Sequence, residues 1–220
     1  MKSYPSIPGP SKAPQSPCIA FYKYDGSNLR FEYSRKRGWW KFGTRRRLFD
    51  ENDPEYGGAI ELFRETYADG LERVFKFEKT YRGIEKATVF CEWFGPSSFA
   101  GYHDWEEDHE VMLIDVEIYK RGMVLPRDFV NHFGHLKIPT IIYEGNFSLQ
   151  FVQDVKEGKY EVAEGVVAKG VNLGKKKSAQ HGLWLRKVKT LWWLNELKQR
   201  AQRDPQFAQA LRENLAEQGV

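Results

Sequence analysis

The chain has few cysteines and no long apolar segment. Its 220 residues include two cysteines, Cys18 and Cys91, and both lie within apolar runs. Cysteines in such runs are typical of buried free thiols in a reducing compartment. No stretch approaches the ~20 apolar residues that a membrane span needs, and the N-terminus lacks the apolar core of a signal peptide. We therefore expect a cytoplasmic protein, in a cell or an infected host, with no membrane partner.

Acidic residues are nearly absent from two segments, which concentrates positive charge more than the net charge of +4 suggests. Residues 30–47 hold eight basic residues and one acid, Glu32, and residues 169–189 hold seven basic residues and no acid. Such segments suit polyphosphates and nucleic-acid backbones. The run Lys175–Lys177 fits a solvated loop equally well, whereas residues 186–189 alternate with apolar residues as in a strand.

The apolar pattern predicts an α+β chain. Five prolines within residues 1–17 predict an extended, disordered start. Strands are expected at residues 18–22, 28–34, 39–44, 89–95, 111–116, 164–169 and 184–189. Helices are expected at residues 58–76, from 126 onward, around 149–155, at 190–203 and at 205–217. A chain of this length can bury a substantial single core.

Lys23-Tyr24-Asp25-Gly26 directly follows the apolar run of residues 18–22. A lysine at the end of a buried strand loses part of its hydration, and burial lowers a lysine pKa. A neutral amine is a nucleophile, whereas an ammonium is not. The tetrapeptide alone also fits an exposed turn with a solvated lysine, so its interpretation depends on the segments that follow it.

Four downstream segments each place ionisable groups in or beside an apolar strand. Burying such groups is costly unless they are paired or bind a metal. They are Glu92 in 89–95, Asp115 in 111–116, Glu164 before 165–169, and Lys187 with Lys189 in 184–189. Alternation in the last segment points both lysines to one face. Several such strands predict a shared polar cleft.

This ordered set resembles the motifs of the covalent nucleotidyltransferases, which comprise ATP-dependent DNA and RNA ligases and mRNA capping enzymes. The match extends over roughly residues 18–190. The first motif, Lys-x-Asp-Gly, corresponds to residues 23–26. Glu92 corresponds to the glutamate of the third motif, and Glu164-Gly165 corresponds to the fourth. Residues 187–189 correspond to the fifth motif, Lys-x-Lys. Continuation of the first motif through Ser27 to Asn28 is most similar to RNA ligases that seal nicks in duplex RNA.

The resemblance implies a nucleotidyltransferase fold, the ATP-grasp-like ligase adenylation fold of antiparallel sheets flanked by helices. This domain would occupy residues 18–190, between the disordered Pro-rich N-terminus at 1–17 and a C-terminal helical tail at 191–220. No appended oligonucleotide-binding (OB) barrel is expected. The implied function is an ATP-dependent RNA ligase of the RNA-repair type. A minimal ATP-dependent DNA ligase, a capping-type guanylyltransferase and a non-catalytic nucleic-acid-binding relative stay open as alternatives, as does the oligomeric state.

The resemblance also implies a mechanism. Lys23 would attack the α-phosphorus of ATP and form a lysyl-AMP intermediate, AMP would pass to a 5′-phosphate end, and a 3′-hydroxyl would displace it. The catalytic residues implied are Lys23, Asp25, Glu92, Glu164, Lys187 and Lys189. Glu92 would contact the ribose and Glu164 would organise the metal or the substrate end. Both glutamates are candidate ligands for Mg²⁺, with Mn²⁺ as an alternative.

The implied ATP site contains further residues. It consists of Tyr22, Lys23, Arg45, Glu92, Ile114, Glu164, Lys187 and Lys189. Relatives carry an aromatic residue just before the position of Asp115, and Ile114 stands there in this chain, so apolar packing is expected to hold the adenine. Nucleic-acid contacts are expected from Asn28, Arg45 and Arg46, and Arg35 competes with Arg45 for the phosphate end.

Overall fold

The computed structural model describes residues 1–96, 98, 108–171 and 182–217. The described residues form two compact units, each with its own sheet. Unit 1 contains residues 1–4, the described part of 25–139 and residues 182–183, and unit 2 contains residues 5–24, 140–171 and the described residues from 184 onward. One boundary therefore falls between Tyr24 and Asp25, within the first motif.

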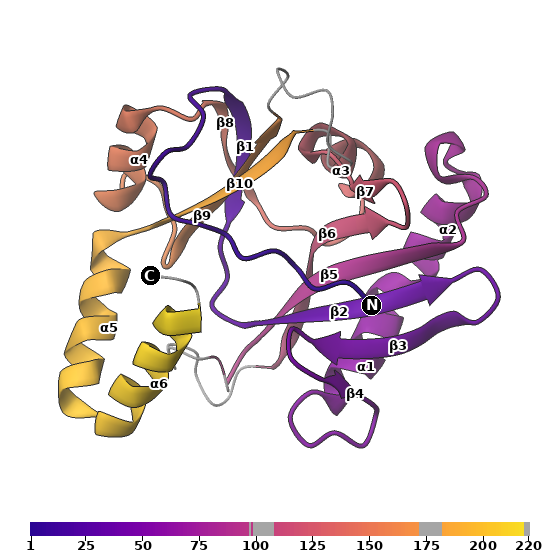
Figure 1. Ribbon diagram of the computed structural model, residues 1–220, viewed down its shortest axis with the longest axis horizontal. Helices are drawn as coiled ribbons and strands as arrows, with labels where there is room; N and C mark the ends of the chain where they lie inside the picture. Colours follow the sequence, from indigo (N-terminus) through magenta and orange to yellow (C-terminus); the bar gives the residue numbers. More distant parts are fainter. Residues whose placement is uncertain (97, 99–107, 172–181, 218–220) are drawn as a thin grey trace. The chain divides into compact units, whose positions relative to one another are not determined.

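Unit 1 is built on a six-stranded antiparallel sheet with the strand order β4-β3-β2-β5-β6-β7 (Figure 1). Its strands are β2 (Ser27–Ser34), β3 (Gly38–Thr44), β4 (Leu48–Phe49), β5 (Lys86–Phe94), β6 (Glu110–Ile118) and β7 (Gly122–Met123). The predicted hairpin of residues 28–34 and 39–44 is confirmed as β2 and β3. Gly38 turns it with a φ of 65°, a conformation that favours glycine.

The helices of unit 1 are α1 (Gly57–Phe63), α2 (Asp69–Phe77) and α3 (Pro126–Phe133). A π-helical turn, Arg64–Ala68, joins α1 to α2, and a 3-10 turn, Lys79–Tyr81, follows α2. The predicted helix at 58–76 is therefore confirmed as one interrupted helical segment. The helix expected from residue 126 begins with Pro126 in its first turn, where a missing N–H costs nothing.

The two faces of this sheet differ because side chains alternate along a strand. Phe31 and its ladder partner Val89 are fully buried on one face, where the Phe31 ring stacks on Phe63 of α1 at 3.9 Å between centroids. The opposite face carries buried polar side chains, namely Arg30, Glu32, Thr88, Asp115 and Glu117. Buried charges need partners, and the predicted site residues Asn28 and Glu92 alternate onto this same polar face.

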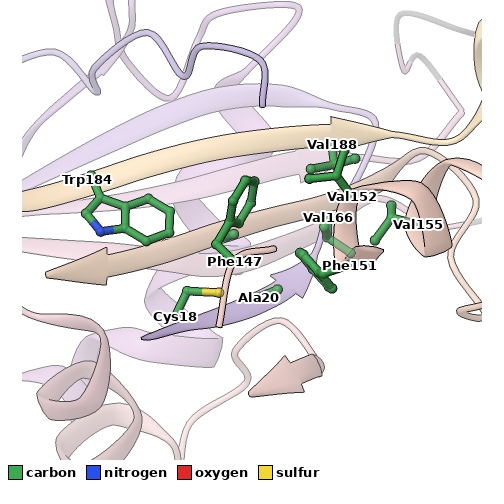
Figure 2. Close-up of a cluster of buried hydrophobic side chains, with 10 residues drawn as sticks. Cys18, Ala20, Phe147, Phe151, Val152, Val155, Val166, Trp184 and Val188 are labelled. Carbon is green, nitrogen blue, oxygen red and sulfur yellow. The ribbon is translucent and has the colours of Figure 1, made fainter. Parts of the chain in front are cut away.

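Unit 2 has a four-stranded sheet with the order β10-β9-β1-β8. Its strands are β1 (Pro17–Tyr22), β8 (Ile141–Asn146), β9 (Gly165–Val171) and β10 (Leu183–Lys189), and helix α4 (Leu149–Lys156) packs on one face. Figure 2 shows the core between them, where Phe147 and Phe151 lie against side chains of β1, β9 and β10. The predicted strand at 18–22 and the predicted helix near 149–155 are both confirmed.

The helices after β10 are α5 (Leu191–Arg203) and α6 (Pro205–Glu217), close to the predicted bounds. The Thr190 hydroxyl caps α5 by accepting the Trp193 N–H at 3.1 Å. The Arg200 guanidinium lies 4.4 Å from the centre of the Phe207 ring and so links the two helices. Among the described residues, no helix has the length and apolarity to cross a membrane.

The structure differs from the sequence-based expectation at the proline-rich start. Tyr4 is buried in unit 1, with its ring 5.0 Å from that of Phe90. In unit 2, the N–H of Lys187 donates to the carbonyl of Pro8 at 3.0 Å. The Tyr4 ring and the Pro8 carbonyl thus make contacts with residues distant in the sequence. The number of prolines in the segment does not predict such contacts.

Candidate active site

The centre of the candidate site in unit 2 is the carboxylate of Glu164. One of its oxygens accepts a hydrogen bond from Lys23 Nζ at 2.8 Å, and the other accepts one from Lys189 Nζ at 2.8 Å. The glutamate side chain is 4% exposed, whereas the two lysines are 21% and 26% exposed. The structure therefore brings together one residue from each of three predicted motifs.

The backbone conformation and close packing at position 165 require the glycine that follows Glu164. Its φ is +143°, a region open in practice to glycine alone, and a Cβ at this position would lie 2.0 Å from the carbonyl oxygen of Val188. The Gly165 carbonyl in turn accepts the N–H of Lys23 at 3.0 Å. The absence of a side chain thus lets β1, β9 and β10 converge beside Glu164.

Thr190 fixes the end of β10 against the same point. Its N–H donates to the Glu164 carbonyl at 3.1 Å, and its hydroxyl donates to the Ala163 carbonyl at 2.7 Å. Because these bonds hold the backbone directly after Lys189, they fix the end of the strand from which that side chain extends. Sequence reasoning did not identify Thr190, although a threonine directly before a helical pattern is a capping signal.

The two ammonium groups control the charge of Glu164. Burial by itself would raise the pKa of this carboxyl, but Lys23 and Lys189 outweigh burial and lower it below the usual value. The carboxylate therefore stays ionised and faces both lysine side chains. Attack by Lys23 needs a neutral amine, so the amine must part from Glu164 or lose a proton before it can react.

Two tyrosines flank Lys23 in the chain and pack on each other, with the rings of Tyr22 and Tyr24 4.8 Å apart. The Tyr22 hydroxyl accepts the N–H of Ala163 at 3.5 Å, next to Glu164. Tyr22 thus contacts the backbone next to Glu164, and its assignment to the nucleotide site stays a prediction. Lys187 is half-buried on β10, two residues before Lys189.

The remaining predicted residues belong to unit 1. Asn28 and Glu92 are directly paired across β2 and β5, and both are partly exposed. A Cβ at Gly26 would lie 2.3 Å from the Trp93 carbonyl oxygen. The glycine of the first motif is therefore required because the start of β2 approaches the end of β5 closely. The Asn28 amide also donates to the Cys91 carbonyl at 3.5 Å.

A bulge positions Ile114. Phe90 pairs with Asp115 and Cys91 with Leu113, so Ile114 is the extra residue of β6 and lies half-exposed beside Asp115. The role of Ile114 in holding the adenine by apolar packing stays a prediction.

Tyr4 is a further residue of unit 1 that contacts Asp115, and sequence reasoning did not identify it. Its hydroxyl donates to the Asp115 carboxylate. The pKa of Tyr4 is raised well above its usual value, first by burial and then by the charge of Asp115 and their hydrogen bond; Glu92 also raises it and Arg45 opposes. Among these three charged groups, Asp115 is the one that contacts the phenol directly. The sequence offers only an aromatic residue in a polar segment as a signal.

The predicted arginines lie after β3. Arg45 receives a hydrogen bond from Ser3 on its carbonyl at 3.5 Å, and the Arg46 N–H donates to the Thr44 hydroxyl at 3.1 Å. Both side chains are outside the regular strand. Lys175–Lys177 lie outside the described residues.

The described residues contain no group of three or more His, Cys, Asp or Glu side chains that could hold a metal ion. Both oxygens of Glu164 are engaged by lysines. These residues alone thus do not assemble a metal centre. Mg²⁺ can be bound through one or two carboxylates together with substrate phosphates.

Sequence comparison identifies no relative, because no family model and no curated protein match the chain. Its fold is similar to that of solved ligases. A Naegleria gruberi RNA ligase variant with ATP and Mn gives a TM-score of 0.63 at 12% identity, and that ligase with PPi gives 0.62 at 12%. The matches cover 89% and 90% of this chain, and 58% of each ligase chain. A candidate ATP-dependent DNA ligase from Aquifex aeolicus gives 0.56 at 16%, covering 94% of this chain and 56% of that one. The chain thus shares their fold and spans less than two thirds of their length.

Proposed function

We propose that this chain is an ATP-dependent RNA ligase that carries AMP on Lys23. The observation that carries the proposal is the buried Glu164 carboxylate, which holds Lys23 and Lys189 at 2.8 Å each. The three residues come from three motifs that are far apart in the sequence, and Gly165 makes their convergence possible. A fold shared with solved ligases supports the same conclusion.

In the first step, the lone pair of Lys23 Nζ forms a bond to the α-phosphorus of ATP. The bond from that phosphorus to the bridging oxygen breaks, pyrophosphate leaves, and the amine proton passes to solvent. Lys187 and Lys189 offset the negative charge on the α-phosphate and the leaving group.

In the second step, a terminal 5′-phosphate oxygen attacks the α-phosphorus and the bond to Lys23 Nζ breaks, so AMP is transferred to the RNA end. In the third, a 3′-hydroxyl attacks that 5′-phosphate and AMP leaves. Glu92 is assigned to the ribose, Asp25 to positioning, and Asn28, Arg45 and Arg46 to the nucleic acid. A divalent ion, Mg²⁺ or Mn²⁺, would neutralise phosphate charge when bound with ATP.

RNA is favoured over DNA by the Ser27-Asn28 continuation of the first motif. The second candidate function is a minimal ATP-dependent DNA ligase, which the likeness to the Aquifex aeolicus protein favours. The two functions share the first step and differ in the strand that receives AMP, so competition between nicked RNA and nicked DNA separates them.

Intact-mass measurement after incubation with ATP and Mg²⁺ tests the first step. We expect an adduct of one AMP on the wild-type protein and no adduct on Lys23→Ala. Lys198→Ala, which removes an exposed lysine of α5, is the matched control and should keep the adduct. An adduct on Lys23→Ala, or none on the wild type, would refute the proposal. An adduct from GTP in place of ATP would indicate capping chemistry instead.

A further inference from the structure

The turn between β2 and β3, together with the adjoining part of β3, carries four basic side chains that form no ion pairs with acidic side chains of the described residues. Arg35, Lys36 and Arg37 are exposed in the turn, and Lys41 is half-buried on β3. Glu32, the ladder partner of Lys41, lies 3.9 Å from the N-terminal ammonium of Met1, and Glu51 is paired with Arg64. Among the described residues, none of these four basic side chains, three in the turn and Lys41 on β3, forms an ion pair with an acidic side chain.

A bulge places an aromatic side chain among these cations. Glu32 pairs with Lys41 and Tyr33 with Trp39, so Trp40 is an extra residue in β3. The Arg37 guanidinium lies 4.7 Å from the centre of the Trp40 ring, and Lys41 Nζ lies 5.5 Å from it. Bulges often redirect a side chain, and this one sets an indole beside two cations. We call Arg35, Lys36, Arg37, Trp40 and Lys41 the hairpin patch.

Trp40 also lines a pocket of about 310 Å³ at the β3–β4 edge of the sheet. Aromatic side chains and the exposed Leu48 contribute to its walls, and Asp50 and Arg64 add polar groups. The volume is at the low end for small-ligand pockets, roughly 300–1,000 Å³. In the strand order, β3 and β4 are separated by β2 from β5, the strand of Glu92. The pocket residues are also different from those of the candidate active site.

From this arrangement we propose that the hairpin patch and its pocket bind a single-stranded segment of the RNA substrate. The cations pair with phosphates, and one unpaired base enters the pocket and stacks on Trp40. Single-stranded RNA is the occupant that fits, because its bases can splay onto aromatic side chains while its backbone follows basic residues. The proposal rests on the proposed function only in naming RNA as the strand.

Fluorescence anisotropy with a labelled, unstructured oligoribonucleotide that lacks a 5′-phosphate tests this site apart from end joining. Trp40→Ala is expected to weaken binding by about 5- to 150-fold, the range measured for loss of base–aromatic stacking. Arg35→Ala with Lys36→Ala is expected to reduce the slope of log affinity against log salt by about 0.7 for each phosphate that the variant no longer neutralises. Trp40→Phe should retain most of the affinity, since a ring stays in place.

Two control variants match these changes elsewhere in unit 1. Tyr119→Ala removes a half-exposed ring that also lies near two lysines, Lys86 and Lys120. Arg73→Ala with Lys76→Ala removes two exposed cations from α2. Both variants are expected to bind RNA as the wild type does.

The AMP adduct on Lys23, measured in parallel, separates the two proposals. An intact adduct in Trp40→Ala together with weakened RNA binding supports the hairpin patch. Binding by Trp40→Ala within twofold of the wild type would overturn it, as would an equal loss in Tyr119→Ala. Absence of the adduct from the wild type would refute the ligase assignment and leave the RNA-binding comparison valid. If Trp40→Ala does not fold, the Arg35 and Lys36 double variant decides the question by its salt slope.

Discussion

Replacement of Glu164 by glutamine is the sharpest test of the cluster in unit 2. The change keeps the shape of the side chain and removes its charge, so Lys23 and Lys189 lose their shared partner. At an effective dielectric constant of about 20, two unit charges at this distance attract by about 6 kcal/mol before desolvation is subtracted. Removing one member of a buried pair typically costs about 3–5 kcal/mol.

The lysines are about a quarter exposed, so they can regain water after the change, and the cost falls below that range. We expect Glu164→Gln to lower the free energy of unfolding by about 2–3 kcal/mol at pH 7, measured by urea titration. For a chain of this size, such a loss corresponds to a fall in Tm of about 4–12 °C. Glu161→Gln, the same change at an exposed position three residues earlier, is the control and should stay within about 0.5 kcal/mol.

The lowered pKa of Glu164 determines how its contribution to stability varies with pH. The pKa of Glu164 is lower in the folded protein than its usual value of 4.5. Its contribution to stability is therefore complete above pH 4.5 and is lost as the pH falls through the folded pKa. The difference between wild type and Glu164→Gln should thus shrink in acid. A variant as stable as the wild type at pH 7, or a difference that does not change with pH, would refute the ion-pair account.

Two further substitutions test other parts of the structure. Tyr4→Phe removes the hydroxyl that donates to buried Asp115 and should lower the free energy of unfolding by about 1–3 kcal/mol. The control Tyr119→Phe, at a half-exposed ring, should change the free energy of unfolding little. Equal effects of the two variants would place Tyr4 outside the core. Gly165→Ala puts a Cβ against the Val188 carbonyl at a φ of +143° and should cost several kcal/mol in a thermal or urea unfolding experiment. Gly158→Ala, at a φ of +75° with open space around it, should cost only about 1–2 kcal/mol, and a smaller loss at Gly165 than at Gly158 would contradict the close approach.

Local patterns were enough to predict most elements. The apolar run before Lys23, the hairpin alternation around residues 34–38 and the helical spacing after residue 57 all correspond to observed strands and helices. These patterns depend on neighbouring residues, so they are visible without the fold. The motif residues lie in or beside apolar strands, where burying an ionisable group is costly, but their roles were implied by the resemblance to the nucleotidyltransferase motifs.

Contacts between distant residues could not be predicted in this way. The sequence indicates that Lys23, Glu164 and Lys189 carry chemistry, but only the packing of β1, β9 and β10 shows that one carboxylate serves both lysines. Likewise, the bulge at Trp40 and the burial of Tyr4 against Asp115 depend on strand register and on side chains more than a hundred residues apart. Residue types and spacing determine which groups are available, whereas tertiary packing determines which of them share a proton, a charge or a ligand.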